Sequence, residues 1–278
     1  MVKIFRLSDR VLTERDGEWR EHAGFSFDAL FTADDPVAVA REVHEGGSAE
    51  AVHEAPPETA LPPLGDQEIW AAGVTYKRSK AARMEEAETS GGDVFYDLVY
   101  EAERPELFFK ATPSRARGHG DKVCIRKDST WDVPEPELTL AINSHGKVFG
   151  FTIGNDMSSR SIEGENPLYL PQAKVYRGSC AIGPCLVVGR DAVDEATSIQ
   201  LAIERAGETV FAGETKLDQL KRGMEELAEF LFRDNEFPFG AYLMTGTGVV
   251  PDSSFTLQGG DGIEIAIDGI GVLRNEVE

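Results

Sequence analysis

Short apolar runs, each bounded by glycine, proline, asparagine or aspartate, dominate the chain from residue 105 onward. They include Leu107-Phe-Phe, Val123-Cys-Ile, Leu138-Thr-Leu-Ala-Ile, Val148-Phe-Gly-Phe-Thr-Ile and Cys185-Leu-Val-Val, and further runs follow near Leu243 and Ile263. Apolar runs of this length between turn residues are typical of strands rather than helices. The pattern predicts many short strands and few helices, so we expect an α+β protein that is rich in β-structure.

One amphipathic segment interrupts this pattern. Leu220, Met224, Leu227 and Leu231 recur at intervals of three or four residues. This spacing predicts a helix from about Leu217 to Phe232 that packs its apolar side on the core.

The first part of the chain has the features of a separate small unit. Val2-Lys-Ile-Phe-Arg-Leu alternates as a strand does, and Asp35-Pro36 predicts the start of a helix that continues through Val43. The pairs Pro56-Pro57 and Pro62-Pro63 bracket a stretch that is unsuited to a helix or a central strand. We therefore expect a small N-terminal α+β domain over residues 1–65 and a catalytic domain over residues 66–278.

The charge of the protein limits its partners. The 278 residues include 49 acidic residues and 28 lysines and arginines, which gives a net charge of −21. Such a surface repels phosphate backbones, so we expect no nucleic acid partner. The composition favours adaptation to high salt, where screening weakens self-repulsion, over the alternative of an ordinary acidic enzyme.

Membrane and secretory signals are absent from the sequence pattern. No window approaches the run of about 18 apolar residues that a transmembrane helix needs, and the first residues lead directly into charged positions. The three cysteines, Cys124, Cys180 and Cys185, are odd in number and form no C-x-x-C pair. This usage is typical of a reducing compartment. We expect a cytoplasmic protein with no membrane partner.

Two carboxylates stand two positions apart in Val133-Pro-Glu-Pro-Glu-Leu. In an extended strand, Glu135 and Glu137 point to the same side, about 7 Å apart along the strand. Two carboxylates on one face repel each other unless a cation, a proton or a basic group lies between them. The spacing therefore favours a cation site, although an acidic strand edge in an acidic protein is the simpler alternative.

A third carboxylate follows from the predicted pairing of two strands. If Asn143-Ser-His-Gly146 forms a four-residue turn, Ile142 faces Lys147 and Glu135 faces Gly154. Asp156 then lies on the same face as the two glutamates, and a slip of one residue would remove it from that face. Three oxygen ligands without histidine or cysteine favour Mg²⁺, with Mn²⁺ or Ca²⁺ as alternatives.

Several motifs resemble those of the fumarylacetoacetate hydrolase superfamily. They are Gly73-Val-Thr-Tyr76, Pro105-Glu-Leu-Phe-Phe-Lys110, Glu135-Pro-Glu137, Gly154-Asn-Asp156-Met-Ser-Ser-Arg160, Lys174 with Gly183-Pro184, Leu243-Met-Thr-Gly-Thr247 and Gly269-Ile-Gly-Val-Leu. The resemblance spans residues 69–278 and implies a mixed β-sheet roll or sandwich, with Glu135, Glu137 and Asp156 as the Mg²⁺ ligands. It also implies a homo-oligomer, a dimer or a tetramer.

One departure from the family pattern bears on the reaction. Hydrolases of the family carry a water-activating histidine at the position of Ser79. The segments 104–113 and 165–174 resemble instead the sugar-acid dehydratase branch. This resemblance implies Mg²⁺-dependent dehydration of 2-keto-3-deoxy-D-arabinonate or 2-keto-3-deoxy-D-xylonate to 2,5-dioxopentanoate, in oxidative pentose degradation. The alternatives are an acylpyruvate-type hydrolase that uses another group, such as Glu106, to activate water, and a binding domain with a degenerate site.

Proton transfer needs an acceptor and a donor in hydrogen-bond reach of the substrate. We assign it to Lys174 and Glu106 together, and either of the two could take the C3 proton. A lysine beside a divalent cation has a lowered pKa, which suits it to this chemistry. Ser79, Arg160 and Thr247 are the expected substrate-binding residues. Ser79 could instead cap a helix, and Arg160 could pair with an acid of the site rather than with the substrate.

Overall fold

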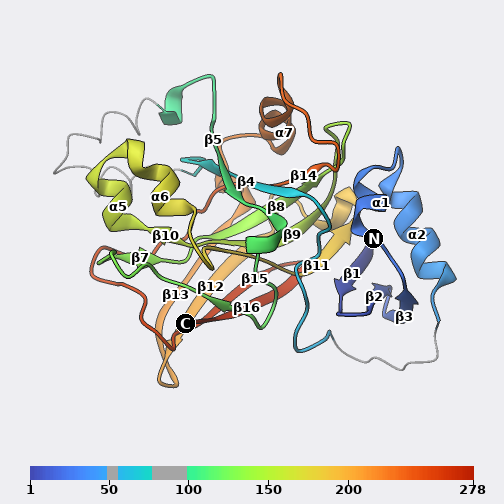
Figure 1. Ribbon diagram of the computed structural model, residues 1–278, viewed down its shortest axis with the longest axis horizontal. Coiled ribbons are helices and arrows are strands. Elements are labelled where there is room, and N and C mark those ends of the chain that lie inside the picture. Colours follow the sequence, from blue (N-terminus) through green and yellow to red (C-terminus); the bar gives the residue numbers. More distant parts are fainter. Residues whose placement is uncertain (49–55, 77–98) are drawn as a thin grey trace.

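Nine strands form the largest sheet, in the order β3-β2-β1-β11-β9-β8-β14-β4-β5 (Figure 1). In the computed structural model, which describes residues 1–48, 56–76 and 99–278, these strands are β1 (Val2–Arg6), β2 (Arg10–Arg15), β3 (Glu18–Ala23), β4 (Glu68–Gly73), β5 (Glu106–Ala111), β8 (Pro136–Ile142), β9 (Val148–Asp156), β11 (Cys180–Val188) and β14 (Ala241–Met244). Only the pair β14 and β4 is parallel; the other neighbours in this sheet are antiparallel.

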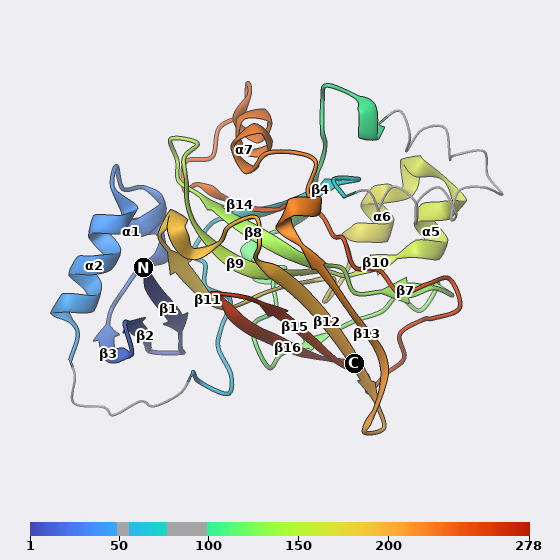
Figure 2. The same ribbon diagram turned by 180° about the vertical axis from the view of Figure 1, so that it is seen from behind.

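A second sheet packs against the first. Its five strands follow the order β13-β12-β15-β16-β6. In the view from behind, β13, β12, β15 and β16 run side by side (Figure 2). The five strands are β6 (Lys122–Val123), β12 (Ser198–Arg205), β13 (Glu208–Lys216), β15 (Gly262–Ile267) and β16 (Gly271–Val277), and a separate two-stranded sheet joins β7 (Asp132–Val133) to β10 (Ser158–Ser159). The expected β-rich fold with mixed sheets is confirmed.

The alternation of side chains along β8 separates two hydrophobic cores. Leu138 and Leu140 belong to the core that is shared with Leu201 and Ile265 of the five-stranded sheet. Ala141 belongs to the other core, which lies on the opposite face of the large sheet. Because side chains alternate with a period of two, Glu137 lies on the same face as Ala141, away from the five-stranded sheet.

The helices are short and lie at the edges of the sheets (Figures 1 and 2). They are α1 (Phe27–Phe31), α2 (Pro36–Gly46), α5 (Arg160–Glu165), α6 (Leu170–Lys174) and α7 (Met224–Phe232), with 3₁₀ turns at Pro113–Arg115, Pro167–Tyr169, Arg190–Ala192 and Leu217–Gln219. Within the described ranges, none of the helices is long and apolar enough to cross a lipid bilayer.

The expected helix after Asp35 is confirmed as α2. The carboxylate of Asp35 accepts a hydrogen bond from the amide of Ala38, and Pro36 occupies the first helical position. Beside it, β1 of the N-terminal segment pairs with β11, so β1, β2 and β3 extend the large sheet. The division into residues 1–65 and 66–278 stays a prediction.

The expected helix from Leu217 to Phe232 is wrong in its first half. The chain forms a 3₁₀ turn at Leu217–Gln219, and α7 begins only at Met224. Gly223 adopts an extended conformation, and the guanidinium of Arg222 donates to the main-chain carbonyls of Ala102 and Glu103. These tertiary hydrogen bonds hold residues 220–223 out of the helix.

Candidate metal centre and active site

The pairing of β8 with β9 differs from the pairing that the turn predicts. Ile142 faces Val148 rather than Lys147, and Ala141 faces Gly150, so Phe149 is an extra residue in the ladder. This β-bulge moves the register by one further residue. Glu137 consequently faces Gly154, and the carbonyl of Glu135 accepts from the amide of Asp156 at 3.0 Å. The predicted register is wrong by two residues, but an even shift keeps the three carboxylates on one face.

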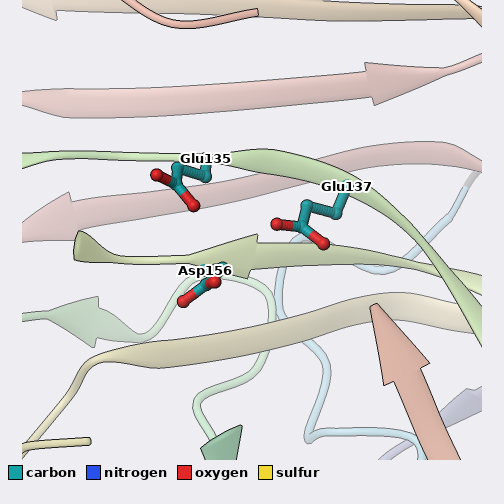
Figure 3. A group of neighbouring side chains, drawn as sticks. All are labelled: Glu135, Glu137 and Asp156. Atoms are coloured by element: carbon teal, nitrogen blue, oxygen red, sulfur yellow. The ribbon is translucent and has the colours of Figure 1, made fainter. Parts of the chain in front are cut away.

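The three predicted metal ligands lie together. Glu135 immediately precedes β8, Glu137 is its second residue and Asp156 is the last residue of the neighbouring β9. Their side chains gather between the two strands (Figure 3). Each offers a carboxylate oxygen within 4.8 Å of those of the other two, and all three residues are buried. The amide of Gly246 donates to Oε2 of Glu137 at 2.6 Å, which orients that carboxylate.

Buried cations contact two of these carboxylates. Nζ of Lys174 lies 2.5 Å from Oε2 of Glu135 and 3.0 Å from Oδ2 of Asp156. Nη2 of Arg160 lies 2.6 Å from Oε1 of Glu135. Of the two partners expected for this arginine, a substrate carboxylate or an acid of the site, the structure therefore shows the acid of the site. Nζ of Lys110 lies 2.5 Å from Oδ1 of Asp156. The side chains of Lys110 and Lys174 have no solvent exposure.

The carboxylates have different proton affinities in these surroundings. Burial raises the pKa of Glu137 well above its ordinary value, and the charges of Asp156 and Glu135 add to this effect. Burial also acts to raise the pKa of Asp156, but the ammonium groups of Lys110 and Lys174 outweigh burial and hold this pKa below its ordinary value. Negative charge is therefore poorly compensated at Glu137, where a cation would favour the ionised form.

The loops after β4 and β14 interlock beside Glu137. Val74 has a φ of 53°, an unfavourable left-handed conformation for a β-branched residue. The turn that it makes brings Oγ1 of Thr75 to the carbonyl of Thr245, to which it donates at 2.6 Å. A Cβ on Gly246 would lie 2.0 Å from this Oγ1, so only glycine leaves room for the amide that reaches Glu137.

A small cavity lies against the three carboxylates, Lys174 and Arg160. Its wall also includes Ala72, Gly73, Val74, Phe108, Gly246 and Thr247. The ring centre of Phe108 lies 5.6 Å from Nζ of Lys174. Thr247 is buried, and its Oγ1 donates to the carbonyl of Val249 at 3.1 Å. The cavity thus combines hard oxygen donors, cations and one aromatic face.

Glu106, the second expected proton-transfer group, is the first residue of β5 and pairs with Gly73 of β4. Its carboxylate lies over Gly73, because a Cβ on that glycine would be 2.0 Å from Oε2 of Glu106. Gly73 lines the cavity, so Glu106 lies next to a residue of the cavity wall. Ser79, the expected substrate-binding serine, lies outside the described residues.

Lys110 has a place in the site that the sequence reasoning missed. Glu106, Phe108 and Lys110 stand at intervals of two along β5, so an extended strand directs all three to one face. This period, counted from Glu106, is the signal that could have identified Phe108 and Lys110 as neighbours of the site.

The donor set fits a hard divalent cation. Three converging carboxylates without histidine or cysteine are the ligands that Mg²⁺ and Mn²⁺ prefer. The raised pKa of Glu137 fits as well, because a bound cation would compensate the buried charge.

Comparison with known proteins agrees with this geometry. Residues 68–278 match the model of the fumarylacetoacetate (FAA) hydrolase C-terminal family. The chain belongs to this family. The matched region contains all the residues of the site described above, and residues 1–67 precede it.

Two relatives in this family carry similar names. The chain is 50% identical over 219 residues to the probable 2-keto-3-deoxyxylonate dehydratase of Haloferax volcanii, covering 78% of this chain and 74% of the relative. It is 42% identical over 218 residues to the 2-dehydro-3-deoxy-D-arabinonate dehydratase of Saccharolobus solfataricus, covering 78% and 73%.

A solved structure extends the likeness to the whole chain. It is a 2-keto-3-deoxy-D-arabinonate dehydratase complexed with magnesium and 2,5-dioxopentanoate, which aligns with a TM-score of 0.83 and 33% identity over 99% of this chain and 98% of that one. The N-terminal residues are therefore included in the structural match, although the family model begins at residue 68.

Proposed function

We propose that this protein is a Mg²⁺-dependent hydro-lyase of oxidative pentose degradation. It dehydrates 2-keto-3-deoxy-D-arabinonate or 2-keto-3-deoxy-D-xylonate to 2,5-dioxopentanoate. The observation that carries the proposal is the buried triad of Glu135, Glu137 and Asp156 with Lys174 against it, in a chain that is 50% and 42% identical to two sugar-acid dehydratases.

In this proposal, Glu135, Glu137 and Asp156 hold the ion. Bound Mg²⁺ would supply Lewis-acid stabilisation of the enolate that forms when the substrate loses a C3 proton. Mn²⁺ prefers similar oxygen ligands and would support the reaction as well. The amide of Gly246 and the guanidinium of Arg160 orient Glu137 and Glu135 for this task.

Lys174 and Glu106 are the proposed proton-transfer groups. Lys174 is buried among the carboxylates, and Glu106 lies over Gly73, which lines the same cavity. One of the two takes the C3 proton, and the other protonates the C4 hydroxyl so that it leaves as water. Loss of water leaves a double bond between C3 and C4. A proton shift from C5 to C3 then forms an enol at C4 and C5, and transfer of the enol proton from the C5 oxygen to C4 gives the aldehyde, so the overall reaction releases one water molecule.

The substrate would lie in the cavity between these groups. Thr247 and Arg160 line the cavity, and we propose both as contacts of the polar substrate together with Ser79. The face of Phe108 provides an apolar wall beside Lys174. Polar groups at a few positions of a shaped cavity fix the orientation of a small ligand.

The test is a product assay with purified protein in high KCl. The protein is incubated with 2-keto-3-deoxy-D-arabinonate, with Mg²⁺ or after treatment with EDTA, and a coupled dehydrogenase reports 2,5-dioxopentanoate. The expected result is aldehyde that forms with Mg²⁺ and is lost with EDTA. Turnover of an acylpyruvate to two acids, without any aldehyde from the sugar acid, would establish the alternative hydrolase.

The cellular setting belongs to the proposal as well. The net charge of −21 supports adaptation to high salt and argues against nucleic acid as a partner. Cys124, Cys180 and Cys185 are buried free thiols, which supports a cytoplasmic location. We also propose that the protein forms a homo-oligomer, a dimer or a tetramer, as its family resemblance implies.

A further inference from the structure

We infer that Lys110 is a positioning residue, which holds the ligand Asp156 and the backbone of Lys174 at a set separation. The inference rests on the proposed function, because it assigns Asp156 to the metal and Lys174 to proton transfer. Lys110 itself does not line the cavity and has no solvent exposure. It therefore acts through its two neighbours rather than on the substrate.

A β-bulge lies at Lys110. Ile69 of β4 pairs with Ala111 and Trp70 pairs with Phe109, so Lys110 between them has no partner in the ladder. A bulge of this kind re-aims a side chain and is common beside active sites. Here the side chain of Lys110 reaches across to the end of β9 and to the last residue of α6.

The ammonium of Lys110 has three acceptors. It donates to the carbonyl of Met157 at 3.0 Å and to the carbonyl of Lys174 at 2.5 Å, and its Nζ lies 2.5 Å from Oδ1 of Asp156. An ammonium group has three N–H donors, of which the two carbonyls take two, and the third contact is an ion pair. Such a group is suited to fix geometry, because three protein oxygens surround it.

The contacts of Lys110 complement those of Lys174. Lys110 contacts Oδ1 of Asp156, whereas Lys174 contacts Oδ2 of the same carboxylate. The same Lys110 ammonium binds the main chain of Lys174. One buried cation thus anchors a metal ligand and the backbone that carries the proton-transfer lysine. Outer partners of this kind are expected to tune both metal affinity and turnover.

The test compares Lys110→Met with Lys110→Arg, which retains the charge, and with Lys147→Met, which removes an exposed lysine from the turn between β8 and β9. Mn²⁺ binding is titrated by electron paramagnetic resonance in the absence of substrate. Loss of the Lys110 ammonium group in Lys110→Met should weaken Mn²⁺ binding by about 10-fold to 100-fold. Lys110→Arg should recover much of this loss, and Lys147→Met should bind as the wild type does.

The sign of the change in Mn²⁺ affinity distinguishes a positioning role of Lys110 from a purely electrostatic effect of its charge. Removal of a positive charge would by itself strengthen the binding of a cation, so tighter Mn²⁺ binding in Lys110→Met would overturn the inference. Unchanged affinity with a lowered Tm would overturn it too, because it would show a merely structural role. If Lys110→Met does not fold, Lys110→Gln is measured in its place and interpreted in the same way.

Turnover gives a second readout. With the kinetics normalised to bound metal, kcat of Lys110→Met should fall by about 10-fold to 100-fold while KM changes by less than about threefold, because Lys110 does not touch the substrate. A wild-type protein that binds Mn²⁺ without dehydrating the sugar acid would refute the proposed function, whereas the Mn²⁺ titration would still decide the role of Lys110.

Discussion

Replacement of Gly73 by alanine tests the place of Glu106 with a single methyl group. The new Cβ would lie 2.0 Å from Oε2 of Glu106, whereas ordinary van der Waals contact begins at 3.4 Å. The carboxylate must therefore retreat by about 1.4 Å, the difference between these distances. The backbone of Gly73 does not have a positive φ, so alanine fits the main chain, and a flexible side chain yields at low cost.

The expected effect on catalysis follows from this displacement. A misplacement of about 1 Å at a reacting group costs roughly 100-fold in rate, or about 2.7 kcal/mol in activation free energy. We therefore expect Gly73→Ala to lower kcat by about 100-fold or more, because the methyl moves Glu106 away from the position of proton transfer. Stability should change little, because no backbone atom is within 3.4 Å of the new Cβ among its three nearest contacts.

The assay is the release of 2,5-dioxopentanoate, measured for the wild type, Gly73→Ala, Glu106→Gln and the double variant. If the methyl acts only through Glu106, the double variant should be no slower than Glu106→Gln. Gly46→Ala is the matched control, since a Cβ there meets nothing within 4 Å. Wild-type kcat in Gly73→Ala would refute the assignment of Glu106, whereas a further loss in the double variant would show that the methyl also acts on the cavity that Gly73 lines.

Three other predictions concern the lysine, the histidines and the charge. Lys174→Ala should abolish turnover while Mg²⁺ still binds, as checked by calorimetry; a fully active variant would remove Lys174 from the mechanism. Burial lowers the pKa of His44 and of His119 below the ordinary 6.5, so the unfolded chain takes up protons first as the pH falls. The free energy of unfolding should therefore drop below pH 6.5, by at most about 1.4 kcal/mol per pH unit for each histidine. Urea denaturation at several pH values should show a smaller pH dependence for His119→Gln than for the wild type, and an unchanged dependence would contradict the buried neutral state. Finally, Tm should be higher in about 2 M KCl than in about 0.1 M, because salt screens the repulsion among the charges of a chain with a net charge of −21; a Tm that falls with KCl would speak against adaptation to salt.

Local patterns in the sequence were sufficient to predict much of the fold. The apolar runs at Leu138 and Val148 became β8 and β9, and the Asp35-Pro36 pair became the start of α2. These predictions succeed because strand alternation and helix capping depend on residues within a few positions of one another. The prediction that Glu135 and Glu137 lie on one face of a strand also depends on neighbouring residues alone. The same is true of the prediction that the metal ligands are oxygens.

Long-range contacts decided what the local patterns did not. Leu220 has the spacing of a helix residue, yet Arg222 binds carbonyls of residues 102 and 103, and α7 starts only after Gly223. Arg160 was equally suited to a substrate carboxylate or an acid of the site, and its contact with Glu135 depends on where α5 lies. Such hydrogen bonds join segments that are far apart in the sequence. They therefore cannot be predicted from a short window of neighbouring residues.

The site itself shows the same division. The residue types and the period of two predicted a cluster of hard oxygen donors, and the family motifs added Lys174 and Glu106 as the proposed proton-transfer groups. Two β-bulges, at Phe149 and at Lys110, decided the rest. The first keeps Asp156 on the face of the glutamates, and the second leaves Lys110, which contacts that carboxylate, without a partner in the ladder. A bulge inserts a single residue whose position depends on the pairing of whole strands, so only the assembled sheet determines which side chains meet.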